Sequence, residues 1–64
     1  MRVPTNEKIV VTYMLDGVAD YICTRNAIKG KYTLYKVTNG DYQKIKVDNT
    51  PVKFDEIIEK ERKK

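Results

Sequence analysis

Two dipeptides constrain the fold of this chain more than any other feature of its sequence. Asp16-Gly17 and Asn39-Gly40 each lie between two runs rich in β-branched and aromatic residues. Asp, Asn and Gly tolerate positive φ angles, which both central positions of a two-residue type I′ turn require. The sequence therefore predicts two β-hairpins. We expect their four strands at about 8–15, 18–24, 31–38 and 41–48.

The segment between the two hairpins is short. Thr24 or Asn26 is a candidate to cap one turn of helix there, and Gly30 is a candidate to end it. A link of this length cannot hold the long helical crossover that parallel strands need. We therefore expect the two hairpins to form one antiparallel meander.

The C-terminal segment has the pattern of an amphipathic helix. Thr50 is a candidate N-cap, and Pro51 suits the first helical position. Phe54, Ile57 and Ile58 recur at helical spacing and form one apolar stripe. This stripe predicts that the helix packs on the sheet through these three side chains.

Together these elements define the expected fold. We expect one α+β domain over residues 1–64: a four-stranded antiparallel sheet from two hairpins, with one C-terminal helix over about 51–62 on one face. A domain of this size hides only about 60% of the surface that its unfolded chain exposes. Its stability margin is therefore small and favours a simple fold over one with a deep active-site cavity.

The predicted turns also assign side chains to faces, because a two-residue turn fixes the strand register. In the second hairpin this register places Leu34 opposite Ile45 and Tyr32 opposite Val47, on a mostly apolar face. The other face then carries tyrosine and lysine side chains into water.

Most of the positive charge lies in that same region. Residues 25–46 carry a net charge of +5, against +4 for the whole chain. Exposed tyrosine rings can stack on bases while lysines contact phosphates, so this face is a candidate surface for nucleic acid or another anion. Its residues are Lys31, Tyr35, Tyr42, Lys44 and Lys46. The competing interpretation is that strand positions in water favour tyrosine for β-propensity and lysine for solubility and edge protection.

The first hairpin is apolar on both of its predicted faces. The turn register places Asp20 opposite Tyr13, where we expect a solvated carboxylate. A chain this small cannot bury both faces alone, so we expect the helix or a second subunit to cover one of them. The candidate protein-interface residues on the reverse face are Val10, Met14 and Tyr21.

Catalytic side chains are scarce in this sequence. The chain has no histidine, no serine and no tryptophan, and histidine is the commonest general base and metal ligand near neutral pH. Cys23 lacks an imidazole partner, so we interpret it as a small buried hydrophobic residue. We expect no enzymatic activity, no metal, no cofactor and no small-molecule substrate.

One cysteine cannot form an intramolecular disulfide, which favours a reducing compartment. We find neither the pattern of a signal peptide nor an apolar run of membrane-spanning length, so we expect a cytoplasmic protein with no membrane partner. The leading hypothesis is a non-enzymatic interaction module that binds another protein or associates with itself as a homodimer. The alternative is nucleic-acid binding through the basic tyrosine and lysine face.

Three segments also resemble a group of known proteins. They are residues 28–37, residues 39–42 and residues 51–57, which are rich in Lys, Tyr, Ile and Asn or carry a Pro and Phe before an acidic run. In length and style the chain resembles small uncharacterised proteins of phages and prophage regions in low-GC Gram-positive bacteria. The resemblance implies a cytoplasmic accessory protein that binds a host- or phage-encoded partner, and it carries over no functional residue.

Overall fold

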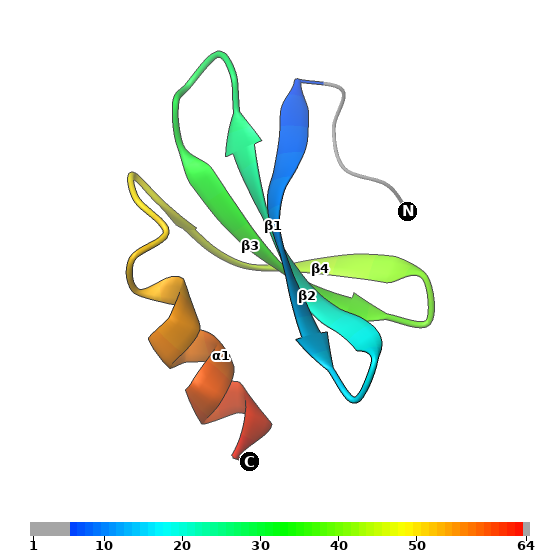
Figure 1. The fold of residues 1–64 in the computed structure, drawn as a ribbon. Coiled ribbons are helices and arrows are strands. Elements are labelled where there is room, and N and C mark those ends of the chain that lie inside the picture. Colours follow the sequence, from blue (N-terminus) through cyan, green and yellow to red (C-terminus); the bar gives the residue numbers. More distant parts are fainter. Residues whose placement is uncertain (1–5, 64) are drawn as a thin grey trace.

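Four strands form one antiparallel sheet in the order β1-β2-β3-β4, and a C-terminal helix packs on one face of it (Figure 1). The structure is a computed structural model, and it describes residues 6–63. Its elements are β1 (Glu7–Leu15), β2 (Val18–Asn26), β3 (Tyr32–Thr38), β4 (Asp41–Asp48) and α1 (Phe54–Arg62). The predicted α+β fold, with two hairpins and one C-terminal helix, is confirmed.

Both hairpin turns have the backbone that their sequences predict. Asp16 and Gly17 have φ angles of 52° and 80°, and Asn39 and Gly40 have φ angles of 48° and 84°. Positive φ at both central positions is the requirement of a type I′ turn, whose twist matches that of the flanking strands. The turns therefore join β1 to β2 and β3 to β4 as expected.

The link between the hairpins is organised by Asn26. Its Oδ1 accepts hydrogen bonds from the backbone N–H groups of Ile28 and Lys29, both at 2.9 Å. Gly30 follows with a φ of 68°. Of the two candidate caps, Asn26 is the one used, whereas Thr24 lies inside β2.

The first hairpin keeps the predicted register at its two ends and shifts by one residue in its middle. Tyr13 pairs with Tyr21, because Asp20 is an extra residue in β2. Val10 is an extra residue in β1 and restores the register beyond it. Such bulges bend a strand and re-aim its side chains. The predicted pairing of Asp20 with Tyr13 is therefore wrong.

The second hairpin also contains a bulge. Beyond Tyr35 the register shifts by one residue, so that Leu34 pairs with Lys46 and Tyr32 pairs with Asp48. The predicted partners, Ile45 and Val47, are wrong. Ile45 is the extra residue in β4, and its side chain packs against the core.

The core lies between α1 and one face of the sheet. Its buried members are Tyr21, Cys23, Leu34, Phe54 and Ile58. The helix contributes two of them, in agreement with the predicted apolar stripe. Cys23 is fully buried, and this burial raises the pKa of its thiol, which favours the unreactive protonated form.

The helix begins later than predicted. It starts at Phe54, with Lys53 in the N-cap position and no hydrogen bond from a capping side chain. Pro51 belongs to a preceding turn, in which its carbonyl accepts a hydrogen bond from the Phe54 N–H at 3.0 Å. The predicted N-cap Thr50 and the start at Pro51 are therefore wrong, because a separate turn at Pro51 precedes the helix.

Candidate functional site

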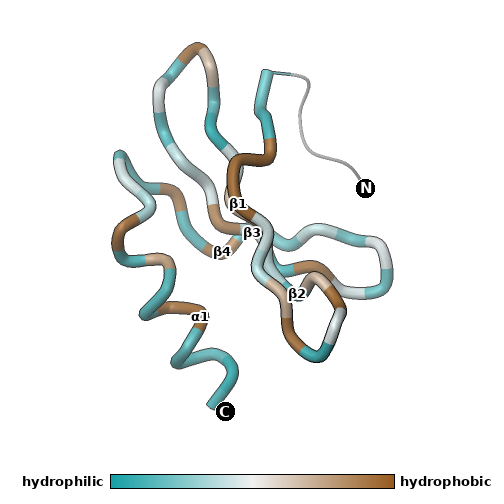
Figure 2. The backbone as a smooth tube through the Cα atoms, viewed as in Figure 1, coloured by the Kyte–Doolittle hydropathy of each residue, from teal (hydrophilic) through white to brown (hydrophobic). Residues whose placement is uncertain are grey.

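The apolar side chains of β1 lie largely in solvent. Figure 2 shows hydrophobic colour along β1 and around the tip of its hairpin. The strand has a neighbour, β2, on one side only, because it is an edge of the sheet. We call the exposed apolar residues of this hairpin the β1 edge, and they are Ile9, Val10, Val11, Met14, Leu15 and Val18. Apolar residues gathered on a protein surface mark contact sites more often than isolated ones do.

The opposite edge of the sheet, β4, has a different character. Its exposed positions carry polar and charged side chains: Asp41, Gln43, Lys44, Lys46 and the single apolar Val47. Charged side chains on an edge strand hinder pairing with a strand from another chain. In β1, no charged residue lies between Lys8 and the turn residue Asp16. Only the β1 edge therefore lacks this protection.

The predicted interface residues separate into two groups. Val10 and Met14 are 48% and 54% exposed and belong to the β1 edge. Tyr21 is only 3% exposed and packs in the core under α1. Of the two covers predicted for this face, the helix or a second subunit, it is α1 that covers Tyr21, so this residue is not available to a partner.

Sequence reasoning missed part of the β1 edge. Ile9, Val11, Leu15 and Val18 alternate as core residues do, and nothing in the hairpin sequence distinguishes them from buried residues. Their exposure follows from the position of β1 at the end of the strand order and from α1 lying over β2 and β3.

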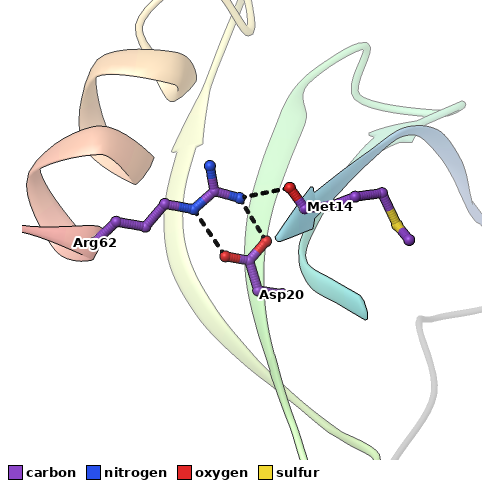
Figure 3. A network of polar contacts seen from close by, with 3 residues as sticks. All are labelled: Met14, Asp20 and Arg62. Atoms are coloured by element: carbon purple, nitrogen blue, oxygen red, sulfur yellow. Dashed lines mark hydrogen bonds and ion pairs between the residues drawn. The ribbon is translucent and has the colours of Figure 1, made fainter. Parts of the chain in front are cut away.

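Arg62 of α1 connects the helix to Asp20 of β2 and to Met14 of β1, and we call these contacts the arginine bridge (Figure 3). Arg62 donates from Nε to Asp20 Oδ2 at 2.9 Å and from Nη2 to Asp20 Oδ1 at 2.8 Å. Nη2 also donates to the Met14 carbonyl at 3.2 Å. These hydrogen bonds from Arg62 hold the pKa of Asp20 below its usual value. Asp20 keeps solvent contact, as predicted for a solvated carboxylate, but the prediction missed its ion pair with Arg62 at the end of α1.

A second polar cluster lies on the sheet face away from α1. One carboxylate oxygen of Glu7 accepts hydrogen bonds from the hydroxyl of Thr24 at 2.6 Å and from that of Tyr35 at 3.0 Å. Tyr35 is 4% exposed. Burial, together with the hydrogen bond to Glu7, raises the pKa of Tyr35 to about 12. This cluster ties β1 to the two central strands.

Burial of Tyr35 changes the predicted basic face. The expectation that this tyrosine faces water is wrong, and its ring cannot receive a stacked base in this conformation. Tyr42 is half-buried and lies with its ring centroid 6.2 Å from that of Tyr35, tilted by 47°. This is an ordinary geometry for two aromatic rings that pack on each other. Tyr42 is thus the one predicted stacking residue that keeps exposed surface.

The three lysines of the predicted basic face do not all lie in one place. Lys31 and Lys44 line a hollow of about 230 Å³ that also contains the Glu7 carboxylate. Its remaining lining residues are Asn26, Lys29, Thr33 and Val47. Lys46 is exposed but does not line this hollow. The predicted set of five residues therefore does not form one continuous surface around two stacking rings.

Among residues 6–63, no group of three or more Cys, Asp or Glu side chains is arranged to hold a metal ion. Over the same residues, no helix has the length and apolar character needed to cross a membrane. Comparison with family models, with curated proteins and with solved structures found no match to this chain.

Proposed function

We propose that this protein is a non-enzymatic interaction module that binds a β-strand of another polypeptide along the β1 edge. The observation that carries the proposal is the exposure of the β1 edge: each of its six large apolar side chains is between 39% and 66% exposed. An edge strand with this composition offers both main-chain hydrogen-bonding groups and an apolar surface.

Strand addition uses these two features in different ways. Main-chain hydrogen bonds supply part of the affinity, and side chains that alternate above and below the sheet supply the specificity. Apolar area removed from water contributes roughly 25 cal/mol per Å². Val10 and Met14 remain exposed although α1 reaches β1 through Tyr13 and Arg62, so a partner strand can remove further apolar area from water there.

Nucleic-acid binding is the second candidate function, and the lysine-lined hollow is the observation that favours it. Lys29 and Lys31 of the link and Lys44 of β4 line the hollow. The Glu7 carboxylate in the same hollow opposes an anion, and Tyr35 is buried. We therefore rank this function below strand binding.

The proposed setting is the cytoplasm. The fully buried thiol of Cys23 has no second cysteine with which to pair, and a protein of this kind does not need an oxidising compartment. An accessory role, binding a polypeptide encoded by the same phage or its host, agrees with the resemblance described above.

A displayed library of random peptides tests the proposed function directly. The wild-type protein should enrich extended apolar peptides, and these should shift NMR signals of residues 8–15 while leaving β4 unchanged. Val10→Lys should abolish their binding, whereas Gln43→Lys, the same charge change on the other edge, should not. Peptides that bind elsewhere on the fold, or no enriched peptides at all, would contradict the proposal.

A further inference from the structure

We propose that the strand bound along the β1 edge is an apolar segment followed, at its C-terminal end, by acidic residues. It runs antiparallel to β1, so that its acidic end lies beside the exposed cations at the N-terminal end of β1. The inference rests on the proposed function and deepens it, because it names the chemistry and the direction of the partner.

Two of these cations oppose each other where β1 begins. Lys8 of β1 and Arg25 of β2 are direct cross-strand partners, and both are exposed. Like charges directly opposite each other on neighbouring strands are destabilising. Among residues 6–63, neither side chain has a carboxylate close enough to form an ion pair. An anionic group brought beside them therefore relieves a repulsion that the fold itself leaves in place.

The link between the hairpins adds two lysines to this end of the sheet. It lies beside the start of β1, because the Ala27 N–H donates to the Asn6 carbonyl at 3.0 Å. Lys29 and Lys31 of the link are exposed and line the same hollow as Glu7, the first residue of β1. The Glu7 carboxylate is a single opposing charge, and it already accepts hydrogen bonds from two hydroxyl groups of the sheet. The start of β1 is therefore a positively charged surface.

The other end of the β1 edge has the opposite character. Asp16 is exposed in the turn that follows β1. The cation nearby is Arg62, whose guanidinium is already bound to the Asp20 carboxylate and the Met14 carbonyl. The nine residues of β1 span roughly 30 Å, about three Debye lengths at 0.1 M salt, so the two ends act on a partner independently. Acidic residues of a partner are therefore attracted to the start of β1 and not to its turn.

The direction of the bound strand follows from the sheet. Each neighbouring pair of strands is antiparallel, and antiparallel pairs are slightly more stable per residue than parallel ones. A strand antiparallel to β1 passes Lys8 with its C-terminal end. Arg25 lies two residues from the buried Cys23 and shares its side of β2, under α1, whereas the hollow lies on the other side. Cations therefore stand on both faces at this end, and the attraction does not depend on the register across the bulge at Val10.

A displayed peptide library tests the preference for acid. Each peptide has a fixed core of alternating Thr and Val, with random residues on both flanks. The wild-type protein should enrich Asp and Glu in the C-terminal flank and not in the N-terminal one. Acid enriched in the N-terminal flank, or enriched equally when the core is replaced by Gly and Ser, would overturn the inference.

Two synthetic peptides of one composition measure the size of the effect. Both have this core and blocked termini, and they carry two glutamates at the C-terminal or at the N-terminal end. The first should bind about fivefold to tenfold more tightly at low salt, because only it forms exposed ion pairs at the start of β1. The difference should shrink as salt screens the charges. NMR titration measures both affinities, and equal values at low salt would contradict the proposed direction.

Lys8→Glu separates binding from folding. The substitution sets a carboxylate opposite Arg25, so it replaces a repulsive cross-strand pair by an attractive one and should raise the urea midpoint. It should nevertheless weaken binding of the C-terminally acidic peptide by about fivefold. Lys46→Glu, the same charge change on β4, should leave that affinity unchanged. A Lys8→Glu variant that keeps the wild-type affinity for this peptide would overturn the inference.

A peptide with the same core and glutamines in place of the glutamates distinguishes this inference from the proposed function. Lys8→Glu should not change its affinity. If this uncharged peptide binds along β1 as tightly as the acidic ones, the inference fails and the proposed function stands. If none of the peptides shifts the NMR signals of residues 8–15, both fail.

Discussion

The edge strand β1 and the central strands β2 and β3 have similar proportions of apolar residues. These residues are exposed on β1 and mostly buried on β2 and β3. Ile22, Cys23 and Leu34 on the central strands are 4%, 0% and 0% exposed, whereas Val10 on β1 is 48% exposed. The central strands have a neighbour on each side, and α1 covers the face that carries Cys23 and Leu34. Burial in this protein therefore depends on place in the sheet rather than on the apolar pattern of a strand.

Because of this difference, one set of apolar residues contributes to folding stability and another is available for binding. Apolar side chains that are already buried stabilise the fold, because their transfer from water is complete in the monomer. Those of β1 are about half exposed, so part of that free energy remains for a partner. The comparison predicts that substitutions in the two regions affect different measurements.

The largest expected loss of stability follows Phe54→Ala. Phe54 is fully buried between α1 and the sheet, and deletion of such a ring costs about 3–5 kcal/mol. A loss of this size is a large part of the stability of a 64-residue domain, so the variant should be mostly unfolded or close to it. Urea denaturation followed by circular dichroism measures the effect. A change below about 1 kcal/mol would show that α1 does not anchor the fold.

Tyr35→Phe should have the second largest effect. The substitution keeps the ring and removes the hydroxyl that donates to Glu7 at 3.0 Å. Loss of a hydrogen bond to a charged acceptor in a largely buried site costs about 1–3 kcal/mol. Tyr42→Phe is the matched control, since Tyr42 keeps exposed surface, and it should cost less in the same urea experiment.

Alkaline pH gives a third test through the same residue. The pKa of Tyr35 is raised from 10.0 to about 12 in the folded state. The folded protein therefore holds its proton where the unfolded chain releases it, so this contribution to stability is complete below pH 10 and is lost towards pH 12. The urea midpoint should fall more steeply over this range in the wild-type protein than in Tyr35→Phe. Parallel curves would contradict a buried, hydrogen-bonded hydroxyl.

Arg62→Ala should have a smaller effect. The bridge to Asp20 lies near the surface, where ion pairs contribute little. The pKa of Asp20 is lowered from 3.8 by the Arg62 hydrogen bonds, so the stabilisation is present above this pH and is lost as the pH falls through the lowered value. The difference between variant and wild-type urea midpoints should therefore shrink in acid. Lys63→Ala, at an exposed site next to it, is the control.

Val10→Ala should have the smallest effect on the stability of the monomer. Its side chain is 48% exposed, and surface substitutions of this kind change the free energy of unfolding by less than about 0.5 kcal/mol. Binding of the enriched peptides should nevertheless weaken, as measured by NMR titration. A large loss of stability without any change in peptide binding would reverse the roles assigned to β1 and the core.

Interactions between residues close in the sequence determine much of the fold. Asp16-Gly17 and Asn39-Gly40 specify their turns, because positive φ is accessible to these residues and the type I′ twist matches that of the strands. Asn26 specifies its link through its own side chain. These interactions lie within a few residues of each other, so the sequence alone was sufficient for the hairpins, the meander order and the helix stripe.

The three bulges and their consequences depend on the tertiary structure and could not be predicted from the sequence. Val10, Asp20 and Ile45 are extra residues in their strands, and each bulge changes which side chains face the helix. A bulge is selected when the packing of distant residues gains more than the disrupted ladder loses, as when Ile45 reaches the core. The sequence identified Val10 and Met14 as surface residues but not the burial of Tyr21 and Tyr35, because that burial depends on contacts with α1 and Glu7, which are distant in the sequence.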